Sequence, residues 1–240
     1  YLGILEKAVK IFEKNNLTYW PMGGTMLGVV RHNAFIPWDD DLDISMMAED
    51  KEKLFEIFEK EEEFVIEEVY WSDGLLLRCP RIRYKDESKN GCIDIFLWER
   101  ADNEPTGDRE LWAKRQKYVQ MKEQAFQKLK PSLHKTLFAG EPITDLHDKE
   151  LIDKLFNDIY KQQRQECQKS GNTIYGQIDM WFEAGRWVGV YAKEDVLPFT
   201  TMKFETLDMP LPNHYDKFLT AQYGDWLALP SKVSPKHTRF

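Results

Sequence analysis

Residues 23–44 constrain this chain more than any other stretch, because they combine a glycine turn with closely spaced carboxylates. The stretch opens at Gly23-Gly24, where the lack of side chains lets backbone amides approach a bound group closely. It closes at Asp41-Leu42-Asp43-Ile44, where acidic and apolar residues alternate. In a β-strand, this alternation places both carboxylates on one face and sends Leu42 and Ile44 into a core. The sequence therefore predicts a strand over residues 40–46 with two acidic side chains beside a glycine turn.

Such a pair of carboxylates predicts a cation site. Neighbouring carboxylates repel each other, and a hard divalent cation, Mg²⁺ or Mn²⁺, relieves that repulsion when phosphate oxygens supply the remaining ligands. The apolar residues after the glycines predict a short helix over residues 26–31, whose N-terminus favours phosphate. Thr25 is then either a hydroxyl donor to phosphate or the N-cap of that helix.

Two other interpretations of the acidic run fit the sequence less well. Asp39, Asp41 and Asp43 occupy the first, third and fifth places of a calcium-binding loop, but the sixth place, which requires glycine, is Ile44. A solvated acidic turn is the usual fate of a charge run, and the apolar alternation argues against it here. A cation site explains both the closely spaced carboxylates and the apolar residues that alternate with them.

The composition of the chain argues against several classes of protein. A chain of 240 residues that is 42% hydrophobic can bury a substantial core, and a net charge of −8 with a pI near 5.3 argues against a nucleic-acid binder. No apolar run approaches the roughly 20 residues of a membrane helix, and no signal peptide precedes the glycine turn. The three cysteines have no Cys-x-x-Cys spacing, which favours a reducing compartment over a disulfide framework or a zinc site.

Periodicity predicts an α/β (α+β) protein, a mixed sheet flanked by helices. We expect one domain over residues 1–240, in which residues 1–100 form the core and residues 101–240 a helical and C-terminal elaboration. Apolar residues at helical spacing predict helices over residues 2–15, 50–60, 111–129, 148–168 and 215–223. β-branched and aromatic runs between turn residues predict further strands over residues 17–22, 64–70, 75–84 and 92–98.

The chain resembles a known family over its most distinctive run. A glycine turn followed by an Asp-hydrophobic-Asp-hydrophobic strand is similar to the metal site of the DNA polymerase beta-like nucleotidyltransferase superfamily. The run from Gly23-Gly24-Thr25-Met26-Leu27-Gly28-Val29-Val30-Arg31-His32 to Phe35-Ile36-Pro37-Trp38-Asp39-Asp40-Asp41-Leu42-Asp43-Ile44 closely resembles the LicD family of phosphocholine transferases, relatives of fukutin and fukutin-related protein. A weaker likeness extends through Ile93-Asp94-Ile95 to Tyr223-Gly224-Asp225 and Pro230.

The resemblance implies a set of site residues. Asp94 takes the third acidic position, so that Asp41, Asp43 and Asp94 are the expected catalytic and metal-binding residues. The alternative for Asp94 is an ordinary, half-exposed strand aspartate. The residues expected to bind the donor phosphate are Gly23, Gly24, Thr25 and Arg31. For Arg31, the alternative is a surface ion pair with Asp39 or Asp40.

Five further residues are candidates. Asp39 is a possible substitute for the third carboxylate, and Trp38 is either part of an aromatic box for a quaternary ammonium group or a core residue. Arg81 and Arg83 are two apart on one strand and point the same way, which suits phosphate binding. His237 resembles a late histidine of the family, unless the tail is frayed.

The implied activity is metal-dependent transfer of a phospho-alcohol group. Phosphocholine from CDP-choline is the first expectation, another CDP-alcohol the second, and the acceptor is a hydroxyl of a glycan or glycoconjugate, as in polysaccharide modification. One alternative is a nucleotidyltransferase that attaches a nucleoside monophosphate to a small molecule or protein, and another is an inactive glycan-binding or assembly module. The expected location is the cytoplasm, at the inner membrane surface, or the Golgi lumen of a eukaryote.

Overall fold

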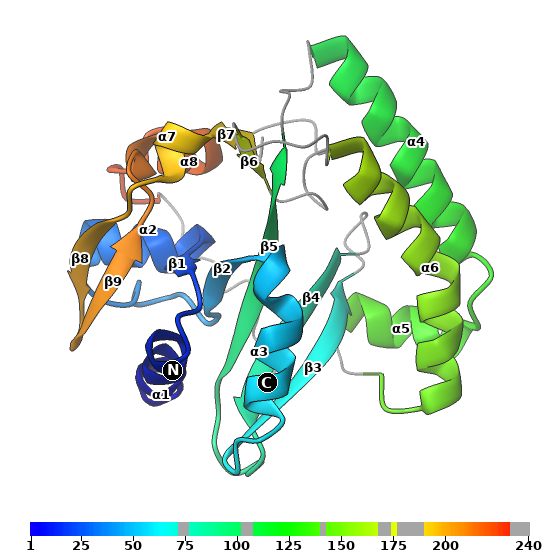
Figure 1. Ribbon diagram of the computed structural model, residues 1–240, viewed down its shortest axis with the longest axis horizontal. Coiled ribbons are helices and arrows are strands. Elements are labelled where there is room, and N and C mark those ends of the chain that lie inside the picture. The colour runs from blue at the N-terminus through cyan, green and yellow to red at the C-terminus, as the bar shows by residue number, and fades with distance from the viewer. Residues whose placement is uncertain (72–76, 102–107, 140–142, 168–173, 177–189, 231–240) are drawn as a thin grey trace. The chain divides into compact units, whose positions relative to one another are not determined.

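The computed structural model describes residues 1–71, 77–101, 108–139, 143–167, 174–176 and 190–230 (Figure 1). The helices in these ranges are α1 (Leu2–Lys14), α2 (Gly23–His32), the short 3₁₀ turn η1 (Ala48–Asp50), α3 (Lys51–Phe58), α4 (Asp108–Phe126), α5 (Pro131–Ala139), α6 (Leu146–Cys167), α7 (Lys193–Val196) and α8 (Tyr215–Tyr223). The strands are β1 (Tyr19–Pro21), β2 (Asp43–Met47), β3 (Phe64–Trp71), β4 (Leu77–Tyr84), β5 (Cys92–Ala101), β6 (Ile174–Gly176), β7 (Val190–Ala192), β8 (Thr200–Phe204) and β9 (Leu207–Leu211). The α/β (α+β) class is confirmed.

The chain divides into two compact units. The first comprises Tyr1–Ile66, Arg81–Leu97 and Lys193–Phe240, and the second comprises Glu67–Pro80 and Trp98–Ala192. A single domain over residues 1–240 stays a prediction. None of the helices in the described ranges is long and apolar enough to cross a membrane.

The strands of the principal sheet follow the order β1-β2-β5-β4-β3, and β6 and β7 extend it from β5. In the first unit, β1 pairs antiparallel with β2, so that Tyr19 lies opposite Met46 and Pro21 opposite Ile44. The antiparallel pair of β4 and β5 places Arg81 opposite Asp94. This order brings β2 and β5, which carry predicted acidic residues, next to each other.

Aromatic side chains form much of the core of the first unit. The ring of Phe12, on α1, lies 5.1 Å from that of Tyr19 and 5.9 Å from that of Phe58. The contacts continue from Phe58 to Phe64 at 5.9 Å and from Phe64 to Tyr84 at 5.4 Å. Because aromatic side chains bury large areas, this chain of contacts fixes α1 and α3 against the sheet.

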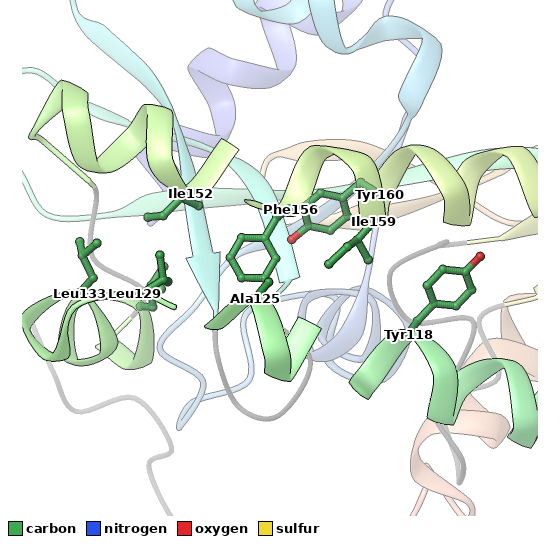
Figure 2. Close-up of a cluster of buried hydrophobic side chains, with 9 residues drawn as sticks. Tyr118, Ala125, Leu129, Leu133, Ile152, Phe156, Ile159 and Tyr160 are labelled. Atoms are coloured by element: carbon green, nitrogen blue, oxygen red, sulfur yellow. The ribbon is translucent and has the colours of Figure 1, made fainter. Parts of the chain in front are cut away.

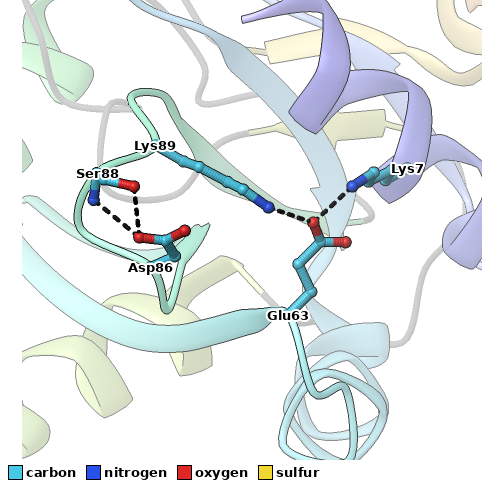
Figure 3. A network of polar contacts seen from close by, with 5 residues as sticks. All are labelled: Lys7, Glu63, Asp86, Ser88 and Lys89. Carbon is cyan, nitrogen blue, oxygen red and sulfur yellow. Dashed lines mark hydrogen bonds and ion pairs between the residues drawn. The ribbon is translucent and has the colours of Figure 1, made fainter.

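A polar network fastens the edge of the same unit (Figure 3). The Glu63 carboxylate accepts hydrogen bonds from Lys7 at 2.5 Å and from Lys89 at 3.0 Å. These two bonds lower the pKa of Glu63. In the turn between β4 and β5, Asp86 accepts hydrogen bonds from the backbone N–H and the hydroxyl of Ser88 at 3.0 and 2.7 Å. The turn is thereby held in shape and joined to α1.

The second unit has its own core, built on α4, α5 and α6 (Figure 2). Its buried residues are Tyr118, Ala125, Leu129, Leu133, Leu137, Ile152, Phe156, Ile159 and Tyr160. Pro131 is the first residue of α5, a position where proline costs no helical hydrogen bond. The helix predicted over residues 111–129 corresponds to α4, and a new helix begins at this proline.

Three expectations about the elements need correction. The strand predicted over residues 40–46 begins only at Asp43, because α2 begins at Gly23 and takes the next backbone groups: the carbonyl oxygen of Met22 accepts the N–H of Met26, and the N–H of Asp43 donates to the hydroxyl oxygen of Thr25. The helix predicted over residues 26–31 begins earlier, at Gly23. Residues 101–240 are not only helical, since they also contain the antiparallel hairpin of β8 and β9 and the strands β6 and β7.

Candidate active site

The site is built where β1 passes into α2. Gly23 is the first residue of α2 and has a φ of +56°, a left-handed conformation that glycine adopts without steric cost. The preceding Met22 donates its N–H to the carbonyl oxygen of Asp43 at 3.0 Å. The start of α2 therefore lies directly against the start of β2.

Two further hydrogen bonds fix the backbone that carries the carboxylates. Thr25 is buried, and its hydroxyl oxygen accepts the backbone N–H of Asp43 at 3.0 Å. The backbone N–H of Asp94 donates to the carbonyl oxygen of Leu42 at 2.9 Å. Leu42 and Ile44 are fully buried, as predicted, whereas Asp41 and Asp43 are half-buried. The predicted alternation is confirmed, although Asp41 precedes the strand.

Three consecutive carboxylates lie close together. Asp39, Asp40 and Asp41 each offer an oxygen atom, and these oxygens all lie within 4.8 Å of one another. A methyl group added to Gly24 would lie 2.3 Å from Oδ2 of Asp39, so only glycine leaves room for that carboxylate. Three oxygen ligands at this separation suit a hard divalent cation.

Asp43 belongs to the same electrostatic cluster. Its pKa is raised well above the usual value, chiefly because its carboxyl group is buried and further because Asp41, Asp94 and Asp39 are negatively charged. The neighbouring Arg81 opposes this shift. The charges of Asp41, Asp94 and Asp39 thus disfavour the ionised form of Asp43, a cost that a bound cation would remove.

Asp94 is held by a two-point ion pair with Arg81. Nε of Arg81 lies 2.6 Å from Oδ1 of Asp94, and Nη2 lies 2.8 Å from Oδ2. Arg81 is 5% exposed and Asp94 6% exposed. The alternative that Asp94 is a half-exposed strand aspartate is therefore wrong. Phosphate binding by Arg81 stays a prediction.

Arg31 contacts backbone carbonyls. Its Nη1 donates to the carbonyl oxygens of Trp226 at 3.0 Å and Ala228 at 3.2 Å, and its Nε donates to the His32 ring at 3.0 Å. The alternative of an ion pair with Asp39 or Asp40 is wrong for the described part of the chain. Phosphate binding by Arg31 stays a prediction, and the observed contacts fasten the end of α2 to the segment after α8.

Two of the remaining candidates, Trp38 and Arg83, lie in half-buried positions. The Trp38 ring meets the His32 ring edge-on at 6.3 Å, and Trp38 is half-buried. Arg83, also half-buried, donates to the carbonyl oxygen of Tyr84 at 3.3 Å. His237 lies outside the described residues.

Three residues near the carboxylates were not predicted as site residues. Asp40 supplies the third oxygen of the close carboxylate group. Gln222 and Tyr223, at the end of α8, lie beside Gly23. The pKa of Tyr223 is raised, chiefly by burial and then by the charges of the acidic cluster, so its hydroxyl stays protonated. The family likeness at Tyr223-Gly224-Asp225 was a signal that could have found it.

The chain is similar in sequence to known proteins. The family model described as LicD/FKTN/FKRP, nucleotidyltransferase domain, matches residues 16–143. The lipopolysaccharide cholinephosphotransferase LicD of Haemophilus influenzae is 25% identical over 252 residues, which cover 98% of this chain and 91% of that protein. The ribitol 5-phosphate transferase FKRP of Mus musculus is 27% identical over 125 residues, covering 51% of this chain and 25% of that protein.

A solved structure is also similar. The structure of ANT(2″)-Ia in complex with adenylyl-2″-tobramycin is 15% identical, with a TM-score of 0.31, and the match covers 67% of this chain and 97% of that one. A likeness this low carries no argument about the site.

Proposed function

Since the chain belongs to the LicD family, we propose that it transfers a phospho-alcohol group, specifically phosphocholine, from a CDP-linked donor to a hydroxyl of a glycan or glycoconjugate. The observation that carries the proposal is the match to a cholinephosphotransferase over 98% of this chain. The match to a ribitol 5-phosphate transferase supports the broader class, because choline phosphate and ribitol phosphate are both phospho-alcohols.

The acidic cluster is proposed to hold Mg²⁺ or Mn²⁺. Asp39, Asp40 and Asp41 present oxygens at a separation that fits one such ion, and Asp43 adds a carboxylate whose pKa is raised by burial and by its acidic neighbours. When bound, the ion supplies charge neutralisation at the diphosphate of the donor. The N–H groups of Gly23 and Gly24, at the start of α2, are the proposed donors to phosphate oxygens.

Asp94 is proposed to complete the metal site and to draw the proton from the acceptor hydroxyl. Both of its oxygens accept hydrogen bonds from Arg81, which fixes the direction in which its remaining lone pairs point. A general base must hold such a fixed position within hydrogen-bond reach of the proton that it removes. The hydrogen bond from its backbone N–H to the carbonyl oxygen of Leu42 keeps Asp94 beside the other carboxylates.

The first test is donor turnover. Incubation with Mg²⁺ and a panel of CDP-alcohols should release CMP, with CDP-choline turned over fastest. EDTA should abolish the release, and added Mg²⁺ or Mn²⁺ should restore it. Full activity in EDTA would contradict the metal assignment.

The same assay separates the rival activity, which the description of the matched family as a nucleotidyltransferase domain favours. A phospho-alcohol transferase leaves the alcohol phosphate on the product, whereas a nucleotidyltransferase leaves the nucleoside monophosphate there. Mass spectrometry of the product distinguishes the two outcomes. No transfer of either group, with any donor, would favour an inactive binding module.

A second test examines Asp39 as a ligand. In Gly24→Ala, the added methyl group would overlap Oδ2 of Asp39, and because this atom ends a flexible side chain, the carboxylate should turn away without unfolding the protein. We expect Mn²⁺ affinity, measured by electron paramagnetic resonance, to fall about tenfold. The matched control is Gly3→Ala, where the added methyl would meet the Tyr84 hydroxyl at an ordinary 3.5 Å. Unchanged affinity in Gly24→Ala would exclude Asp39 from the ligand set.

A further inference from the structure

Three polar side-chain atoms converge on the first residue of α2. A methyl group added to Gly23 would lie 3.2 Å from Oδ2 of Asp43, 3.6 Å from Nε2 of Gln222 and 4.0 Å from the Tyr223 hydroxyl oxygen. Asp43 comes from β2, and the other two residues come from the last turn of α8. The space that a side chain at Gly23 would fill is therefore bordered by a carboxylate on one side and by an amide and a hydroxyl on the other.

The amide and the hydroxyl are both available as donors. Nε2 of Gln222 donates to the Tyr223 hydroxyl oxygen at 3.0 Å, which uses one of its two hydrogens. The Tyr223 hydroxyl accepts that bond and keeps its own hydrogen to donate, and the structure records no acceptor for this hydrogen among the described residues. Both donors can pair with an acceptor oxygen, such as that of a phosphate group.

The end of α8 is fixed at this place by α2 itself. Gly224 ends α8 with a φ of +69°, and its N–H donates to the carbonyl oxygen of Thr220 at 2.9 Å. Two residues later the chain is held by Arg31, which binds the carbonyl oxygens of Trp226 and Ala228. The α8 segment is therefore contacted by both ends of helix α2, by Gly23 at its start and by Arg31 near its end. These contacts hold the Gln222 amide and the Tyr223 hydroxyl in a defined position.

We propose that the Tyr223 hydroxyl and the Gln222 side-chain amide donate hydrogen bonds to diphosphate oxygens of the donor, and so are further binding residues of this site. The inference rests on the proposed function for the identity of the donor. A diphosphate oxygen in the space beside Gly23 would have the acidic cluster, with its proposed cation, on one side. These two donors would lie on its other side. Its negative charge is what makes such hydrogen bonds strong.

The test compares Tyr223→Phe with Tyr215→Phe. Both variants lose one hydroxyl group from α8, but Tyr215 is in the first turn of the helix, about 12 Å along its axis from Tyr223. Isothermal titration with inorganic pyrophosphate in the presence of Mg²⁺ should show affinity reduced about tenfold or more in Tyr223→Phe and unchanged in Tyr215→Phe. In the transfer assay, KM for CDP-choline should rise by a similar factor.

The outcomes separate the two proposals. If the wild-type protein releases CMP from CDP-choline but Tyr223→Phe matches it in both pyrophosphate affinity and KM, the inference is overturned and the proposed function stands. If no CDP-alcohol is turned over but Tyr223→Phe still weakens pyrophosphate binding, the donor is misidentified and the inference stands. Lack of pyrophosphate binding by the wild-type protein overturns the inference. Should Tyr223→Phe fail to fold, Gln222→Met provides the same comparison.

Discussion

Asp43→Asn should reduce transfer about a thousandfold or more, on the order of 4 kcal/mol in the activation barrier, while the fold is kept. The substitution preserves side-chain volume and removes the charge that the cation is proposed to meet. The backbone bonds of Asp43 to Thr25 and Met22 do not involve the carboxylate, so they remain. The measurement is CMP release at saturating Mg²⁺, and near-normal turnover would show that Asp43 is no metal ligand.

The same variant should be more stable than the wild type when metal is absent. The pKa of Asp43 is raised in the folded protein, so the folded chain binds this proton more tightly than the unfolded chain does. The stability of the wild type therefore falls as pH rises from the unfolded pKa, about 4, through the raised folded pKa, and above it the full cost is present. Asp43→Asn removes that cost.

Thermal unfolding in EDTA should accordingly give a higher Tm for Asp43→Asn than for the wild type at neutral pH, and the difference should shrink towards pH 4. Added Mn²⁺ should raise the Tm of the wild type far more than that of the variant, because only the wild type keeps the complete ligand set. Asp216→Asn, an exposed residue of α8, is the matched control and should show neither effect. A less stable Asp43→Asn protein in EDTA would mean that the carboxylate is needed for folding.

Local pattern was sufficient to predict the acidic strand. Leu42 and Ile44 are buried, so Asp41 and Asp43, which alternate with them, are left at the margin of the core. The position of Asp94 was predicted by the family likeness, and its place beside Leu42 agrees with that. What local pattern did not predict was that Asp41 lies before the strand, because that depends on how far β1 extends.

The β8–β9 hairpin was missed because its turn lacks the usual residues. Glu205 occupies the left-handed region with a φ of +53°, where glycine or asparagine is the common choice. Pro210 also argued against a strand, although it is tolerated where its missing N–H is not needed by the ladder. A turn held by its surroundings leaves no local signature in the sequence.

Contacts between distant residues were beyond sequence reasoning for another reason. Arg31 meets Trp226 and Ala228, and Gly23 meets Gln222 and Tyr223, across nearly 200 positions of the chain. Periodicity describes one element at a time and says nothing about which elements meet. The partner of Arg81 was likewise a matter of strand register, since Arg81 and Asp94 are brought opposite each other only by the pairing of β4 with β5.

Variants that break the Arg81–Asp94 pair should lose both stability and activity, and the two losses can be measured independently. Both residues are buried, so removal of either partner leaves the other without its opposite charge in the pair, at a cost of about 3–5 kcal/mol. We expect Asp94→Asn and Arg81→Met each to lower the free energy of unfolding by about this amount. In the double variant, the loss should be smaller than the sum of the two, because both charges of the pair are removed together.

Activity in the same three variants decides what Asp94 does. If Asp94 only neutralises Arg81, the double variant should recover transfer relative to Asp94→Asn, since the guanidinium that Asp94 neutralises is gone as well. If Asp94 binds metal and accepts the proton of the acceptor hydroxyl, the double variant should stay as inactive as Asp94→Asn, with single-turnover transfer about 10²–10⁴-fold below the wild type. We expect the second result, with CDP-choline binding less affected than turnover, because the contribution of a base grows as the hydroxyl loses its proton. Recovery of transfer in the double variant would shift the third catalytic carboxylate to Asp39, whose position against Gly24 already places it with Asp40 and Asp41.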